Sequence, residues 1–531
     1  VRYSAKDLSA LVDKAVPAGD IKRLLESLNG FYAICYLDQR GTVVAAVDRA
    51  RSIPLFYAVQ DGRLVISDDA RWVANQVGAT DISRRFATDL LMTAFVTGRN
   101  TLVDEVRQLQ LGELLEAERI RGGWNLKTSY HYHFHHQAST DCSLGSQRRK
   151  LESALDAAAV RLLDYASGRQ ILLALSGGLD STMLALALRR RGCDNVSAFT
   201  YGSRHSLEIR HSREVAETLG FPWACSYYTP GRWRSWLAGD SRRSYWDWSH
   251  NLCSLPHVQD YMAVEELLER GDVRPDAVVV AGQSVEAFYG IQFAPEDWAA
   301  LRAPGFSAER LADIVYRLHY RLWPGSCFGR QTREEMKQLI LDSLGSPEDY
   351  GTAVSYFEAW VVREKMAKFN NNSVRAYEQL GLDWWLPLFD HDIIRFWIQL
   401  PCQLRYGRAF TRGFVPELFR SVTSAGYDYT QGYSGYEQAA RRFRPLVWRG
   451  GWPAELYLAL KRELKYSRDR MGWYQVIHRA LYRRLFHYRF NINSLLVLEF
   501  LGALNLGQQS GWLEGLRLPE ELELQLAQLA G

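Results

Sequence analysis

The sequence lacks the marks of a secreted protein and of a membrane protein. Its seven cysteines are scattered without a CxxC pair, which leaves no spacing for a disulfide framework or a zinc ribbon and favours a reduced, cytoplasmic compartment. No window of about 18 consecutive apolar residues occurs, so no membrane span is predicted. The first residues carry no apolar h-region, so no signal peptide is expected either.

A strong excess of charge of one sign is also missing. The 64 Lys and Arg residues against 60 Asp and Glu give a net charge of +4, which gives no indication of a nucleic-acid partner. The 47% of hydrophobic and 23% of charged residues are ordinary for globular proteins and exclude disordered, collagen-like and coiled-coil chains. Aromatic residues are abundant, at 13% of the chain, and this favours aromatic-rich cores over stacking surfaces.

The length predicts more than one domain. A chain of 531 residues exceeds the roughly 250–300 residues that one hydrophobic core supports. Residues 1–135 contain short β-branched and aromatic runs that are broken at turn residues, and a polar linker follows at 136–147. We therefore predict a β-rich domain over residues 1–140 and a second domain over residues 148–531.

The second domain alternates between predicted strands and helices. This alternation is typical of a parallel sheet with helices on both faces, and the C-terminal part of the chain is helix-rich. The fold class expected for the whole chain is therefore α/β. The predicted strands cover 171–175, 196–201 and 277–281, and the predicted helices cover 149–166, 182–191 and 207–219.

A glycine-rich motif joins the first of these strands to a helix. It reads Leu-Ser-Gly-Gly-Leu-Asp-Ser-Thr over residues 175–182. Two glycines let the backbone turn tightly and expose N–H groups to an anion, and the helix start adds its positive dipole end. The lysine of a Walker loop is absent. Asp180 would repel a phosphate unless Mg²⁺ lay between them, so its expected role is a metal or water contact.

An SGGxDS motif after a strand is the signature of the PP-loop ATP pyrophosphatases, and the chain resembles the asparagine-synthetase superfamily over nearly its whole length. Residues 198–202 match the family's adenine-lining strand, and Glu208 matches a recurrent acidic position. Residues 280–286 occupy the place of the SGEGxDE loop, and residues 386–391 resemble VPFLDH.

The resemblance implies that a substrate carboxylate attacks the α-phosphorus of ATP, that pyrophosphate leaves, and that an amine then displaces AMP. Mg²⁺ would be held by Asp180 and Glu286. Gln283 stands where the family has a glutamate that handles the amine, and Gln cannot accept a proton at neutral pH. Arg408 or Arg405 would replace an expected lysine. The residues implied to bind ATP are Leu175, Ser176, Gly177, Gly178, Asp180, Ser181, Thr200, Tyr201 and Gly282.

The N-terminal domain resembles the class II glutaminase domain, an Ntn-type αββα fold. The matching stretches are 28–33, 48–57 and 66–69. That domain needs an N-terminal cysteine as nucleophile, and here the first cysteine is Cys35, which lies in a predicted strand and is expected to be core. Only 27 residues precede Leu28, so the domain is either degenerate or without its upstream part. As given, it is not expected to hydrolyse glutamine.

Several substrates fit this pattern. One branch of the superfamily, from bacterial surface-polysaccharide gene clusters, amidates uronic acids with ammonia or another external amine as donor. The sequence resembles this branch most closely in residues 46–57, 254–260 and 371–378. Intramolecular amide formers, such as β-lactam synthetases and lasso-peptide cyclases, are the alternative, and a non-catalytic nucleotide-binding scaffold is another. A polar-aromatic cluster that would line a sugar or a peptide pocket comprises Tyr245, Trp246, Trp248, His257, Gln259 and Asp260.

Three alternating histidines form a separate candidate. His131, His133 and His135 would share one face of a strand, as three imidazole ligands of Zn²⁺ do. Ordinary histidines at a strand end next to the linker are the preferred interpretation.

Overall fold

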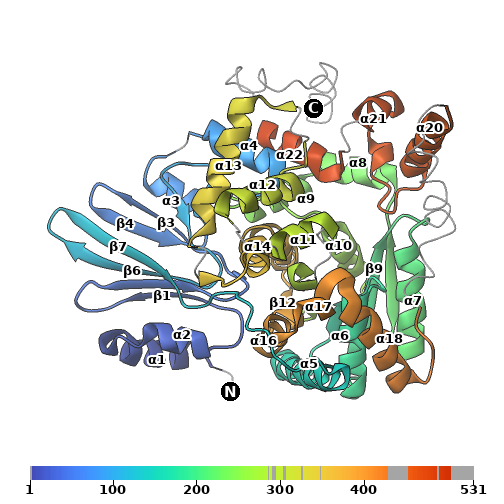
Figure 1. Ribbon diagram of the computed structural model, residues 1–531, viewed down its shortest axis with the longest axis horizontal. Coiled ribbons are helices and arrows are strands. Elements are labelled where there is room, and N and C mark those ends of the chain that lie inside the picture. Colours follow the sequence, from blue (N-terminus) through green and yellow to red (C-terminus); the bar gives the residue numbers. More distant parts are fainter. Residues whose placement is uncertain are drawn as a thin grey trace.

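The computed structural model describes residues 3–79, 81–284, 286–289, 295–302, 307–323, 327–346, 349–428, 452–486 and 490–503 (Figure 1). Within these residues, no helix combines the length and the apolar character that a membrane span requires. The predicted α/β class is confirmed: a β-rich N-terminal part is followed by a parallel sheet and a helix-rich C-terminal part.

The N-terminal part consists of two stacked antiparallel sheets with helices on both outer faces. Side chains along each strand alternate between the two faces. In β2 (Val43–Val47), Val44 and Ala46 pack against α1 (Ala5–Ala18) and α2 (Ile21–Ser27), whereas Ala45 and Val47 pack between the sheets. The first sheet has the order β1 (Ala33–Leu37), β2, β6 (Glu113–Ile120), β7 (Gly123–Tyr130), and the second has the order β4 (Arg63–Ser67), β3 (Phe56–Gln60), β5 (Arg107–Gln108).

The second sheet is covered by α3 (Ala70–Gln76), and α4 (Arg84–Thr93) packs against the C-terminal helix Ile492–Ala503. The expectation that Cys35 belongs to the core is wrong, because its side chain is exposed. It lies in β1, an edge strand, where the neighbours Ile34 and Tyr36 point to the helical face and Cys35 points away from it. A strand residue on an edge has one neighbouring strand instead of two, and here that leaves Cys35 open to solvent.

The second part of the chain forms a five-stranded, fully parallel sheet in the order β10-β9-β8-β11-β12. From β8 the chain winds to β9 and β10 on one side, and β11 and β12 lie on the other. The strand order therefore reverses between β8 and β11, and ligands of such sheets bind at that reversal, beyond the carboxyl ends of the strands. The strands are β8 (Ile171–Ala174), β9 (Val196–Gly202), β10 (Trp223–Tyr227), β11 (Val278–Val280) and β12 (Asp383–Trp385).

The helices around this sheet bury apolar stripes against it. The helix α6 (Leu179–Arg190) is almost wholly buried and packs along α5 (Leu144–Ala166), α7 (Leu207–Leu219) and α18 (Ala409–Thr423). Further helices used below are α8 (Pro230–Ala238), α9 (Asp240–Ser249), α10 (Tyr261–Glu269), α12 (Ala308–His319), α14 (Ala353–Val361), α15 (Val374–Gln379), α16 (His391–Gln399) and α17 (Cys402–Arg405).

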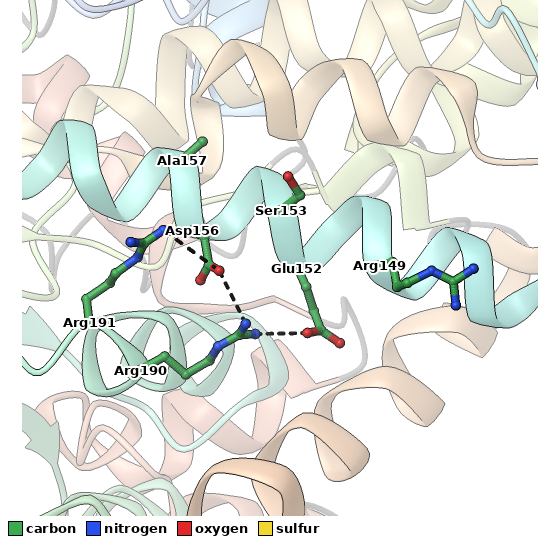
Figure 2. A pocket seen from close by; sticks show the side chains of 7 residues that line it. All are labelled: Arg149, Glu152, Ser153, Asp156, Ala157, Arg190 and Arg191. Carbon is green, nitrogen blue, oxygen red and sulfur yellow. Dashed lines mark hydrogen bonds and ion pairs between the residues drawn. The ribbon is translucent and has the colours of Figure 1, made fainter.

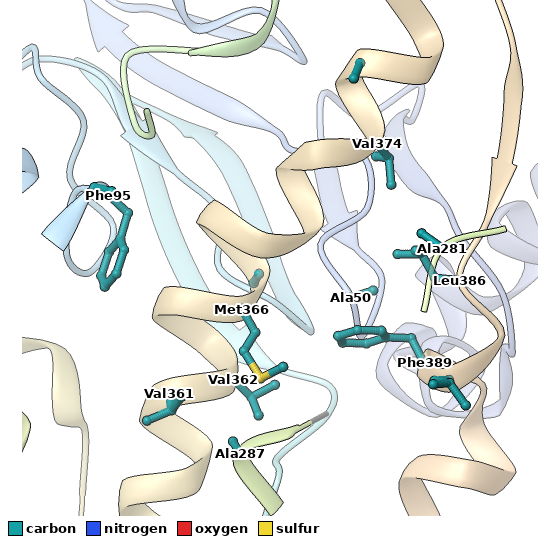
Figure 3. Close-up of a cluster of buried hydrophobic side chains, with 14 of the residues drawn as sticks. Ala50, Phe95, Ala281, Ala287, Val361, Val362, Met366, Val374, Leu386 and Phe389 are labelled. Carbon is teal, nitrogen blue, oxygen red and sulfur yellow. The ribbon is translucent and has the colours of Figure 1, made fainter. Parts of the chain in front are cut away.

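Both parts of the chain share one hydrophobic core. Figure 3 shows Ala50 from the N-terminal part among side chains of the second part such as Met366 and Phe389, and the Phe95 ring lies 6.3 Å from that of Trp360 in α14. Hydrogen bonds reinforce this contact: the Asn371 side-chain amide donates to the Ala50 carbonyl at 2.8 Å. The division at residues 140–148 stays a prediction.

A fully buried ion pair lies in this shared region. Glu364 and Lys368 are on a π-helical segment (Val362–Asn370) that continues α14, and their side chains are both inaccessible to solvent. The Lys368 ammonium also donates to the carbonyls of Val96 at 2.9 Å and Gly98 at 2.6 Å, and the Gly98 amide donates to Glu364 at 2.9 Å. The pair thus joins a π-helix of the second part to a loop of the first.

A buried carboxyl nearby predicts a pH-dependent stability. Asp89 in α4 is buried, and this burial raises its pKa to about 7 despite hydrogen bonds from Thr97. The Asp89 carboxyl contributes on the order of a few kcal/mol to the free energy of unfolding. This contribution is fully present below about pH 4 and is lost as the pH rises through about 7. We expect Asp89→Asn to remove much of the difference in urea midpoint between pH 5 and pH 8. The exposed Asp342→Asn should leave that difference unchanged, and an Asp89→Asn protein that kept it in full would contradict this expectation.

The three alternating histidines do not form a shared site. Among the described residues, no group of three or more His, Cys, Asp and Glu side chains is placed to hold a metal ion. The His131 imidazole lies 2.9 Å from the Val47 carbonyl, His133 contacts the ring of Tyr130, and His135 contacts the side chain of Gln137.

Candidate functional site

The glycine-rich loop lies at the carboxyl end of β8, next to the reversal of strand order. It runs directly into α6, which begins at Leu179, so Asp180 and Ser181 fall in the first helical turn. Gly177 has a φ of +70°, and a Cβ there would lie 2.5 Å from the His211 Cβ and 2.8 Å from backbone atoms of α7. Only glycine meets both conditions, so the backbone is held where its N–H groups are accessible to an anion.

The hydroxyl groups of the loop are arranged around its turn. The Ser176 and Ser181 Oγ atoms lie 3.1 Å apart, and the Gly178 amide donates to Ser176 Oγ at 3.3 Å. The adjacent Leu175 is buried in the core, and its amide donates to the Phe199 carbonyl of β9 at 2.8 Å. Leu175 therefore anchors the loop, whereas Ser176 and Gly178 are exposed beyond the carboxyl end of β8.

The loop after β11 lies beside the glycine-rich loop. β11 pairs with β8 in parallel, and a Cβ on Gly282 would lie 3.3 Å from the Ser181 Cβ. The Ser284 hydroxyl donates to the Asp180 carboxylate at 3.4 Å. Two segments about a hundred residues apart in the chain thus meet at Asp180.

Arg408 reaches the same carboxylate from a third segment. Its guanidinium lies 3.8 Å from the Asp180 carboxylate. Gly407 and Arg408 both have left-handed φ values, +64° and +62°, directly before α18. A non-glycine residue in this conformation costs about 1–3 kcal/mol and is found most often at functional sites. Arg405, the other arginine considered, is fully buried and donates to both carboxylate oxygens of Glu358 at 3.0 Å, so it does not reach the loop.

Replacement of Arg408 should weaken the use of ATP. We expect Arg408→Ala to lower kcat/KM for MgATP by about 10²-fold, since it removes a positive charge next to the loop, and Arg408→Lys to lower it less. Steady-state pyrophosphate release checks this, with Arg412→Ala in the neighbouring turn of α18 as the control. Equal kcat/KM for Arg408→Ala and the unchanged protein would refute it.

Gln283 is held in one orientation by its neighbours. Its Nε2 atom donates to the Asn370 carbonyl at 3.3 Å and to the Ser373 hydroxyl. A carbonyl only accepts, which fixes Nε2 on that side and turns Oε1 the other way. Among the described residues, Oε1 has no hydrogen-bond partner although it is buried. Glu286 begins a short 3₁₀ helix, Glu286–Tyr289, and its side chain lies outside the described residues.

The end of β9 carries Thr200 and Tyr201. Thr200 is buried, and Tyr201 stacks on Tyr228 with ring centroids 5.4 Å apart. A Cβ on Gly202 would lie 2.7 Å from the Arg470 carbonyl, and the Arg470 guanidinium donates to Glu208 at 2.6 Å. The C-terminal part of the chain therefore packs against the end of β9.

Sequence reasoning missed Tyr427 and Arg470. The Tyr427 hydroxyl donates to the Gly177 carbonyl at 2.6 Å and lies 3.1 Å from the Thr182 hydroxyl. It thereby helps to hold the glycine-rich loop in shape. Neither residue lies in a motif, and each contacts a segment about 250 residues away, so no local signal in the sequence would have found them.

The predicted polar-aromatic cluster is divided in the structure. Trp248 is 47% exposed, and Trp246 is buried against Phe500 and Arg242, away from the other members. The remaining four stay together: the Tyr245 hydroxyl donates to the His257 carbonyl at 2.6 Å, and the chain then passes through Gln259 to Asp260. The cluster as predicted is thus reduced to a group around His257 and Asp260.

A shallow depression between α5 and α6 does not belong to this site. Figure 2 shows Arg190 between Glu152 and Asp156, at 3.0 and 3.2 Å, with Arg191 also directed at Asp156. These residues lie at the end of α6 opposite to the glycine-rich loop. Arg190 and Arg191 pair with the two carboxylates, and Arg149 leaves one excess positive charge at this depression, away from the glycine-rich loop.

Two family models match the sequence. Residues 4–130 match the glutamine amidotransferase domain, and residues 150–232, which include the glycine-rich loop, match asparagine synthase. No curated protein gives a significant match. Among solved structures, a glutamine-dependent NAD⁺ synthetase from Acinetobacter baumannii in complex with ADP matches with 11% sequence identity and a TM-score of 0.20, over 64% of this chain and 84% of that one.

Proposed function

Because the chain is a PP-loop protein of the asparagine-synthetase superfamily, with an ATP-dependent ligase activity as its general class, we propose that it makes an amide from a carboxylic acid through an acyl-adenylate. In this proposal, a carboxylate oxygen attacks the α-phosphorus of ATP and pyrophosphate leaves. An amine then attacks the adenylate carbonyl carbon, and AMP leaves.

One observation carries the proposal: three separate segments meet at Asp180, at the reversal of strand order. The glycine-rich loop supplies backbone donors and hydroxyls, the loop after β11 supplies Gly282 and Ser284, and Arg408 adds a positive charge. Fixed donors of this kind stabilise the charge that develops on a leaving pyrophosphate without reorganising. The Asp180 carboxylate would oppose such an anion unless a cation shields it.

The residues around Asp180 fit a Mg²⁺ ion that accompanies ATP. Mg²⁺ prefers carboxylate oxygens together with phosphate oxygens and water. Asp180 supplies a carboxylate in the first turn of α6, with a side chain 17% exposed, and Glu286 is the second expected ligand. When bound, the ion would neutralise charge on the phosphates of ATP.

For the substrate, we propose a uronic acid, free or as a nucleotide sugar, with ammonia as nitrogen donor. The three sequence stretches that resemble the uronic-acid-amidating branch lie together in the structure. Asn371 and Arg375 donate to the Ala50 and Ser52 carbonyls, and the Tyr377 hydroxyl donates to Asp260 at 2.5 Å. A substrate that carries its own amine, and so forms the amide within one molecule, is the alternative.

The test is acid-dependent exchange of radiolabelled pyrophosphate into ATP, over a panel of glucuronate, galacturonate and their UDP derivatives, aspartate and short peptides. We expect exchange with one uronic-acid member and amide formation when ammonia is added. Glutamine in place of ammonia tests whether the N-terminal domain supplies nitrogen. ATP binding without exchange for any acid would favour the scaffold and refute the ligase.

A further inference from the structure

A largely inaccessible histidine–aspartate pair lies next to Tyr228, which follows β10 and stacks on Tyr201 of β9. The His257 Nδ1 atom is 3.3 Å from the Asp260 carboxylate, with side chains that are 17% and 8% exposed. The other carboxylate oxygen of Asp260 accepts a hydrogen bond from the Tyr377 hydroxyl at 2.5 Å. Asp260 thus binds both groups from a fixed position directly before α10.

The segment that carries the pair is fixed on both sides. The Tyr245 hydroxyl of α9 donates to the His257 carbonyl, and the Tyr228 hydroxyl donates to the Gln259 carbonyl, each at 2.6 Å. These bonds hold residues 257–260 against the ends of β10 and α9. The imidazole is therefore set in place from the backbone as well as from the carboxylate.

Asp260 is ionised at neutral pH. Burial raises the pKa of its carboxyl, but the adjacent His257 imidazole and the hydrogen bond from Tyr377 outweigh burial and leave the pKa below its usual value. The phenol groups around it stay neutral, since burial and then the Asp260 charge raise the pKa of Tyr201, Tyr228, Tyr245 and Tyr377 well above 10.

A series of contacts connects the imidazole to the segment that holds Gln283. The His257 ring centroid lies 5.5 Å from that of Phe369, and the next residue, Asn370, accepts the hydrogen bond from the Gln283 amide. Within the described part of the chain, no hydrogen-bond partner contacts His257 Nε2. The imidazole is 17% exposed and so partly accessible from solvent.

We propose that His257 is the general base of the amide-forming step and that Asp260 is its positioning residue. The inference rests on the proposed function. As the amine nitrogen bonds to the adenylate carbonyl carbon, one N–H proton passes to His257 Nε2. The carbon–oxygen bond to AMP then breaks, and AMP leaves with the electron pair. Gln283 has no basic atom for this proton, whereas the ionised Asp260 stabilises the imidazolium that forms.

The experiment separates the two half-reactions in His257→Gln. The acid is the panel member with the fastest pyrophosphate exchange, and the nucleophiles are ammonia and hydroxylamine. We expect amide formation from ammonia to fall by about 10²–10³-fold, while exchange stays within about twofold, since the base acts only after adenylation. Hydroxylamine, a stronger nucleophile for its basicity, should lose less. Asp260→Asn should lose about tenfold with ammonia, because it keeps the imidazole but removes the charge that orients it.

Two controls accompany the experiment. His135→Gln, next to the linker, should leave both half-reactions unchanged, and the thermal unfolding midpoint of His257→Gln should match that of the unchanged protein. Amide formation at the normal rate in His257→Gln would overturn the inference. So would equal losses of exchange and amide formation, which would indicate a role in binding. If the unchanged protein exchanges no pyrophosphate with any acid, the proposed function fails and this inference falls with it.

Discussion

Asp180→Asn is expected to lower acid-dependent pyrophosphate exchange by about 10³-fold or more. The substitution keeps the size of the side chain and its contact with Ser284 but removes the negative charge at the point where three segments meet. Without that charge, the cation that shields the phosphates loses a ligand, and such losses of transition-state stabilisation amount to about 4 kcal/mol, where each 1.36 kcal/mol is tenfold in rate.

A matched control is available one helix away. Asp156→Asn, in α5, removes a carboxylate of similar exposure that pairs with Arg190 at the far end of α6. It should leave exchange unchanged. Initial rates at several Mg²⁺ concentrations complete the measurement, because a weakened metal site should be partly restored by excess Mg²⁺. Normal exchange in Asp180→Asn would mean that the site is assigned to the wrong residues.

Lys368→Met is expected to destabilise the protein by about 3–5 kcal/mol. Removal of one partner of a fully buried ion pair leaves the other charge without compensation in a medium of low polarity. Here the remaining charge is Glu364, whose side chain is inaccessible to solvent. The carbonyls of Val96 and Gly98 also lose their donor, so the contact between the two parts of the chain loosens as well.

Two comparisons identify burial as the cause. Lys337→Met breaks the exposed pair with Asp313, which has a separation of 2.6 Å, and should cost about 1 kcal/mol or less. The double variant Glu364→Gln and Lys368→Met removes both charges and should be more stable than Lys368→Met alone. Urea unfolding at pH 7 measures all three. A loss below about 1 kcal/mol for Lys368→Met would contradict the account of this interface.

Local patterns in the sequence predicted the centre of the site well. The strand, glycine-rich turn and helix at 171–190 follow from an apolar run, two glycines and a helical period, all within about twenty residues. The helix was predicted from residue 182 but begins at Leu179, because Asp and Ser are favourable in a first turn and were attributed to the loop. The predicted strand 196–201 covers β9 except for its last residue, Gly202, and the predicted strand 277–281 contains β11.

Other features depend on contacts between distant segments. The sequence alone does not distinguish Arg405 from Arg408, because both are arginines and they lie three residues apart. In the structure, the left-handed turn at Gly407–Arg408 directs Arg408 to Asp180, whereas Arg405 stays buried. Cys35 appeared to be core because its strand is apolar, but the position of β1 at the sheet edge decides its exposure. Tyr427 and the Glu364–Lys368 pair depend on packing that no short window of sequence contains.

The most direct test of the central claim follows oxygen from the acid. The active panel acid, labelled with ¹⁸O in its carboxylate, is converted with ATP and ammonia, and the phosphorus products are examined by mass spectrometry. An acyl-adenylate route places one ¹⁸O atom in AMP and none in pyrophosphate. Label in inorganic phosphate, together with ADP, would show an acyl phosphate instead and would contradict the account.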